Sequence, residues 1–71
     1  MKKLLNEFTE LFGLDDNEVI CLILSDNRYL LTKVDDNKSI VLYKTKSRKE
    51  MKVFLKEQIK EANLFASIHL N

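Results

Sequence analysis

The chain has 71 residues and a mass of 8.4 kDa, which suffices for one small domain with one core. Hydrophobic residues make up 45% of the chain, which excludes a disordered protein, and the net charge of +1 excludes a polycationic nucleic-acid binder. We therefore expect residues 1–71 to form a single compact domain that depends on packing for its stability.

Residues that catalytic, metal and cofactor sites require are scarce. The one cysteine, Cys21, cannot form an internal disulfide, and with a single histidine it cannot supply a structural zinc site. That histidine, His69, lies two residues from the end, and one glycine is too few for phosphate-binding loops. The acidic turns at residues 15–18 and 35–36 lack the spacing of a calcium loop. We expect a protein that is not an enzyme and binds no metal and no cofactor.

The sequence also bears on where the protein acts. Its longest apolar run, residues 19–24, is far shorter than the roughly 20 residues needed to span a bilayer, and it is not placed as a signal peptide would be. We expect a cytoplasmic protein without membrane contact. Ten lysines against two arginines, with no proline, are typical of an AT-rich genome such as that of a low-GC bacterium or its phages.

A first helix is expected over residues 2–12. Its apolar residues recur at helical spacing on one face, and they are Leu4, Leu5, Phe8, Leu11 and Phe12. Gly13 follows and is expected to end the helix.

Three strands are expected next. Residues 18–25 are almost wholly apolar, which indicates a central strand covered on both faces. Residues 28–34 alternate, with Tyr29, Leu31 and Lys33 on one face and Leu30, Thr32 and Val34 on the other. Residues 39–45 form the third strand, with Ile40 and Leu42 opposite Val41 and Tyr43. The short polar connectors predict an antiparallel meander.

A second helix is expected from Ser47, which begins a capping box with Glu50 reaching back toward it. A core-facing stripe follows at helical spacing, formed by Met51, Phe54, Leu55, Ile59 and Ala62. The predicted fold is therefore α+β, in the order α-β-β-β-α, with a three-stranded antiparallel meander and the N- and C-terminal helices packed on one face.

Apolar residues near the C-terminus surround more of the helix than one sheet face needs to cover. Such surface commonly marks a binding site for a partner or for a second copy. The candidate interface residues are Leu64, Phe65, Ile68 and Leu70, together with Tyr29 and Tyr43 if these lie on an uncovered sheet face. The alternatives are that the helix end folds back over the sheet and that both tyrosines lie at the edge of the core.

The densest charge cluster spans the end of the third strand and the start of the second helix: Lys44, Lys46, Arg48, Lys49 and Lys52. The order of elements resembles the double-stranded-RNA-binding domain, whose second helix opens with lysines that grip phosphates. Arg48, Lys49 and Lys52 match that spacing, and residues 5–7 resemble the family's groove-contacting helix. Residues 25–28 form a shorter loop than the family's, without its glycine, proline and histidine. The resemblance implies duplex binding, and the alternative is a solvated helix face neutralised by nearby glutamates.

Together these features favour a small non-enzymatic protein-interaction module that binds a protein partner or itself. Its size, its near-neutral charge and its AT-rich amino-acid bias are typical of phage or mobile-element inhibitors, such as anti-CRISPR proteins, that block a host complex by steric binding. Carboxylates in the turns could imitate nucleic-acid phosphates, and they are Asp15, Asp16, Asp26, Asp35 and Asp36. The alternative function is nucleic-acid binding through the basic cluster.

Overall fold

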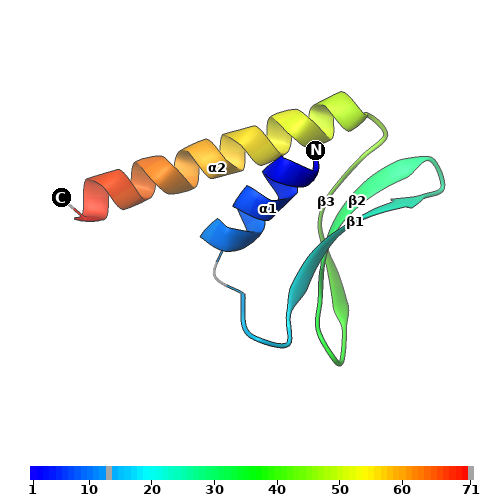
Figure 1. Ribbon diagram of the computed structural model, residues 1–71. Coiled ribbons are helices and arrows are strands. Elements are labelled where there is room, and N and C mark those ends of the chain that lie inside the picture. Colours follow the sequence, from blue (N-terminus) through cyan, green and yellow to red (C-terminus); the bar gives the residue numbers. More distant parts are fainter. Residues whose placement is uncertain (13, 71) are drawn as a thin grey trace.

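The computed structural model contains two helices and three strands, which are α1 (Lys2–Leu11), β1 (Val19–Ser25), β2 (Arg28–Val34), β3 (Ser39–Thr45) and α2 (Arg48–Leu70) (Figure 1). The structure describes residues 1–12 and 14–70, with side chains described up to residue 65. Gly13, the predicted helix end, therefore lies outside the described residues. The order of elements and the antiparallel sheet confirm the predicted α+β fold.

The sheet has the strand order β1-β2-β3, with both pairs antiparallel. A two-residue turn joins β1 to β2, and both of its residues have positive φ, 52° at Asp26 and 60° at Asn27. Asp and Asn tolerate this conformation, and a turn of this kind matches the twist of a hairpin. The strand predicted to be central, residues 18–25, is therefore an edge strand. That prediction was wrong because the turn pairs β1 with β2 alone, which leaves β2 in the middle.

A β-bulge interrupts the pairing of β2 with β3. Leu31 pairs with Tyr43 and Thr32 pairs with Val41, so Leu42 is an extra residue without a partner in β2. The predicted alternation along the third strand was wrong past this point. Because of the extra residue, Ile40 and Tyr43 lie on the same face of the sheet instead of on opposite faces.

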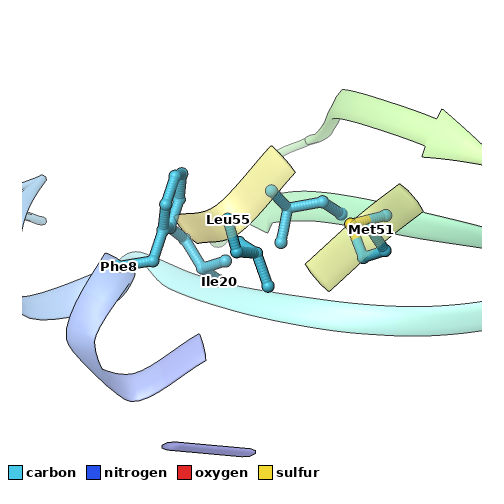
Figure 2. Close-up of a cluster of buried hydrophobic side chains, with 5 residues drawn as sticks. Phe8, Ile20, Met51 and Leu55 are labelled. Atoms are coloured by element: carbon cyan, nitrogen blue, oxygen red, sulfur yellow. The ribbon is translucent and has the colours of Figure 1, made fainter. Parts of the chain in front are cut away.

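Both helices cover the same face of the sheet, and the core lies between them and it (Figures 1 and 2). The buried apolar side chains come from α1, β1, β2 and α2, and they are Phe8, Ile20, Leu31, Met51 and Leu55. Leu31, Met51 and Leu55 are fully buried, which confirms the predicted stripe on the second helix. By contrast, Leu11 and Phe12 were expected on the core face of α1 but remain 41% and 45% exposed. They lie at the end of α1, where the sheet no longer covers it.

Hydrogen bonds that involve the side chains of Thr45, Ser47 and Glu50 stabilise the start of α2. The Ser47 hydroxyl oxygen accepts the Glu50 N–H at 3.2 Å, as predicted for a capping box. The Glu50 carboxylate does not reach back to Ser47, because it accepts the buried Thr45 hydroxyl at 2.6 Å. That hydroxyl oxygen in turn accepts the Ser47 N–H at 3.2 Å. The last residue of β3 thereby fixes where α2 begins.

The small core makes each buried side chain important for stability. Replacing Leu55, which has no exposed surface, by Ala should lower the free energy of unfolding by about 2–5 kcal/mol, because a cavity forms where the helix meets the sheet. The matched substitution Val53→Ala, on the same helix at a site 46% exposed, should change it by less than about 0.5 kcal/mol. Urea denaturation followed by circular dichroism measures both. Equal effects would contradict the assignment of the core.

Candidate functional site

The folded chain exposes more surface than its mass requires. Its accessible area is 5478 Å², whereas monomers of 8.4 kDa average about 4,600 Å². Its radius of gyration is 13.0 Å, against about 11 Å for a compact domain of this length. Eleven large apolar side chains among those described are exposed, compared with five that are buried. Many of these exposed apolar side chains lie in two places.

The first apolar place is a groove between the end of α1 and the outer part of α2. Helix α1 is much shorter than α2, so α2 continues past it and beyond the sheet (Figure 1). We call this groove the helix groove. It has a volume of about 470 Å³, and the residues that line it are Leu11, Phe12, Gln58, Glu61, Ala62 and Phe65. Leu64 and Phe65 are 59% and 63% exposed. Large apolar side chains thus remain in contact with solvent along this part of α2.

A cavity of about 380 Å³ adjoins the helix groove, because Phe12 and Gln58 line both. It lies between the helices and the sheet, and the bulge residue Leu42 contributes to its wall. An ion pair also lines the cavity, with Lys33 Nζ 3.3 Å from Glu18 Oε2. The cavity and the helix groove together form one depression whose lining is mainly apolar and includes several charged residues, which is typical of a binding site.

The interface residues expected from the sequence fall into three groups. Leu64 and Phe65 are exposed on α2, and Phe65 lines the helix groove. Ile68 and Leu70 have side chains outside the described residues. Tyr29 and Tyr43, expected either on an uncovered face or at the edge of the core, both pack against the core on the helix side.

Tyr43 shows why the tyrosines take the alternative position, at the edge of the core. Its ring stacks on that of Phe54, with centroids 4.0 Å apart and planes within 1° of parallel. The bulge places Tyr43 opposite Leu31, on the face that α2 covers. The uncovered face of the sheet therefore holds neither tyrosine.

The second apolar place is the sheet face that no helix covers, which we call the open face. The registers place eleven residues on it. Seven occupy its central part, Val19, Cys21, Ile23, Leu30, Thr32, Val34 and Val41, and four polar residues lie toward its ends, Ser25, Arg28, Ser39 and Lys44. Val19 and Val41 are about half exposed, at 53% and 50%. Sequence reasoning missed this surface because it assumed that another layer covers β1. The signal was present in the unbroken apolar run of that strand.

Thr32 lies at the centre of the open face. It is only 3% exposed, because larger side chains surround it, and its hydroxyl oxygen has no hydrogen-bond partner within the described structure. A buried hydroxyl without a partner costs about 1–3 kcal/mol. Cys21, the free cysteine, is half-buried beside Thr32 on the neighbouring strand.

The basic cluster expected from the sequence is brought together at the start of α2. Lys44, Lys46, Arg48 and Lys49 are exposed, and Lys52 is partly buried. Within the described residues none of the five forms an ion pair. Glu50, the carboxylate expected to neutralise them, accepts the Thr45 hydroxyl instead. The cations are thus available to an external anion.

Two carboxylates in the turns are stabilised in their charged form. The Asp15 N–H and then the Lys33 ammonium lower the pKa of Glu18, since both donate to its carboxylate. The Asn37 and Lys38 N–H groups lower the pKa of Asp35, whose Oδ1 accepts both, at 2.8 and 2.9 Å. Each carboxylate ties together the turn next to a strand end.

Comparison of the chain with known protein families, with curated proteins and with solved structures finds no match. Over the residues that the structure describes, neither helix combines the length and apolar character needed to cross a membrane. In the same residues, no three His, Cys, Asp or Glu side chains gather as metal ligands would. The function must therefore be inferred from the surfaces described above.

The lowered pKa values predict a loss of stability in acid. A carboxylate whose pKa is lower in the folded state stabilises the fold above its ordinary value, near ~4, and loses that contribution as the pH falls through the lowered value. The double variant Glu18→Gln/Asp35→Asn should therefore lose less stability than the natural chain between neutral pH and about pH 3. Urea denaturation at a series of pH values measures the difference.

The matched control is Asp36→Asn, because Asp36 has no hydrogen bond or ion pair to the described residues. This control should keep the pH dependence of the natural chain. Parallel stability curves for the natural chain and the double variant would show that the two turns do not depend on charged carboxylates.

Proposed function

We propose that this protein is a small non-enzymatic interaction module that binds an apolar segment of a larger protein. The observation that carries the proposal is the continuous apolar depression formed by the helix groove and the adjoining cavity. Monomeric proteins rarely leave such surface in water unless it has a binding role. A groove between two helices is suited to an amphipathic helix that inserts its apolar face.

The charges around the depression indicate the chemistry of the partner. Asp15, Glu18 and Glu61 line it, and its one cation, Lys33, is already paired with Glu18. The rim is therefore acidic. A partner segment with large apolar anchors and basic residues beside them complements both the shape and the charge of this site.

Binding of this kind acts by occupation of a surface. A module of 71 residues covers a patch on a host protein or complex and denies it to other ligands, as phage-encoded inhibitors such as anti-CRISPR proteins do. The near-neutral charge and the AT-rich bias of the sequence support an inhibitor from a phage or a mobile element of a low-GC bacterium that acts in the cytoplasm. Homodimerisation would present the binding site twice.

Selection of a displayed random-peptide library on the immobilised protein tests the groove. We expect the enriched peptides to carry apolar residues at helical spacing with Lys or Arg beside them. Phe65→Glu should weaken their binding at least about tenfold, since it places a charge in the apolar groove. Val53→Glu makes the same kind of change at an exposed site outside the groove and should leave affinity unchanged. Fluorescence anisotropy gives the affinities.

Two results would reject the groove as the binding site. One is the absence of any enriched peptide on the natural chain. The other is equal loss of affinity in the two variants while circular dichroism shows both to be folded.

A second function, nucleic-acid binding, is favoured by one specific observation. The cations at the start of α2 are exposed and, within the described residues, unpaired. Arg48 and Lys49 stand in the first turn of α2, where the positive end of the helix dipole adds to their attraction for phosphate. The order of elements also resembles the double-stranded-RNA-binding domain.

Duplex binding is tested with an RNA duplex of about 16 base pairs, the span that such domains contact. If the function is correct, the affinity falls with salt, and Arg48→Glu/Lys49→Glu weakens it at least about tenfold. The control Lys2→Glu/Lys3→Glu makes the same change in net charge on exposed residues of α1 and should have a smaller effect. A lack of binding by the natural chain at low salt would end this alternative.

A further inference from the structure

We propose that the open face of the sheet binds the open face of a second copy, which forms a two-fold symmetric homodimer. This goes beyond the proposed function, because the helix groove lies on the other side of the sheet. The uncovered face of an antiparallel sheet ordinarily carries polar side chains. Here its central part is mainly apolar, with Cys21, Ile23, Leu30 and Val41 around Thr32, and polar residues lie toward its ends, Ser25, Arg28, Ser39 and Lys44. That is the anatomy of a protein interface.

The open face contributes to the excess surface of the molecule. The chain exposes about 900 Å² more than the average for its mass, and the open face and the helix groove share this excess. With five buried apolar side chains, the core of one copy is small. A second copy gives the open face an apolar layer to pack against, as in a sandwich of two sheets.

A central row of residues identifies the second copy as the partner. The registers place Cys21, Thr32 and Val41 side by side across the three strands. A two-fold axis along this row sets each of these residues against the same residue of the other copy. All three side chains are small, so the two sheets approach most closely there.

The charges at the two ends of the sheet support the same two-fold axis. The end with the β1–β2 turn is mainly cationic, with Arg28, Lys44 and Lys46 against Asp26. The other end is mainly anionic, with Asp15, Asp16, Asp35 and Asp36 against Lys38. An axis that crosses the strands lays the cationic end of one copy over the anionic end of the other. The open face is thereby complementary to itself.

The dimer leaves both helix layers on the outside. Each copy then presents its helix groove to solvent, on opposite sides of the assembly. Such a dimer binds two partner segments at once, and linkage of the two sites raises the overall affinity for a repetitive or symmetric target.

Light scattering during size exclusion tests the dimer directly. We expect a mass of twice 8.4 kDa for the natural chain. Val41→Glu should give a folded monomer, because the axis places two carboxylates against each other in an apolar layer. Ile40→Glu is the matched control, since Ile40 is the adjacent residue on the other face and is 39% exposed. It should remain a dimer.

The natural Cys21 thiol reports whether the open face is the surface used. Its reaction with N-ethylmaleimide should be at least about tenfold slower in the dimer than in Val41→Glu, and should slow as the concentration of the natural chain rises. The concentration series needs no variant, so the test holds even if Val41→Glu does not fold. A monomeric natural chain would overturn the proposal. A dimer in which Cys21 reacts at the monomer rate would overturn it as well.

Discussion

The core cluster of Phe8, Ile20, Leu31, Met51 and Leu55 holds two helices to one face of a three-stranded sheet, and the other features of the molecule depend on it. Helices α1 and α2 are the only layer that the described chain places on the sheet, so one face is covered and the other is not. Small domains bury a low fraction of their surface, and here the buried part is one compact cluster. The remaining apolar side chains are not part of that cluster, and many of them are exposed to solvent.

Two structural details decide where the remaining apolar side chains are exposed. Because α1 ends at Leu11 while α2 continues to Leu70, the outer part of α2 extends past the end of α1. The bulge at Leu42 then turns that residue toward the helices, where it lines the cavity next to the helix groove. On the other side of the sheet, the regular pairing of β1 with β2 leaves an apolar face. The same shortage of covering layers thus creates both surfaces.

The helices and turns could be predicted from the sequence because their signals are local. The apolar spacing of Met51 and Leu55 reports a helix face directly, and the Ser47 cap marks where α2 begins. The role of Thr45 in that cap was not visible, because it requires the last turn of the chain before α2 to fold back on itself. The bulge at Leu42 was also hidden, since no glycine or other residue of special conformation marks it.

The surfaces were harder to predict than the elements, for a different reason. An unbroken apolar strand such as residues 19–24 has the same pattern whether its own chain or another molecule covers it. The apolar run was interpreted in the first way, which placed β1 at the centre of the sheet, and the weak alternation of β2 and β3 left the position of Tyr43 open. Leu64 and Phe65 were recognised because they exceed what a single helix face needs. A surplus of apolar residues therefore predicts exposed apolar surface, without indicating where on the molecule that surface lies.

The central claim is that the folded chain depends on association to cover its apolar surface. The most direct test is urea denaturation of the natural chain, followed by circular dichroism, over about a hundredfold range of protein concentration. Mass action predicts that the urea midpoint rises with concentration, because each unfolding event must also separate two copies. A midpoint that stays the same across the whole range would contradict the claim, since it would show that association does not contribute to the stability of the folded chain.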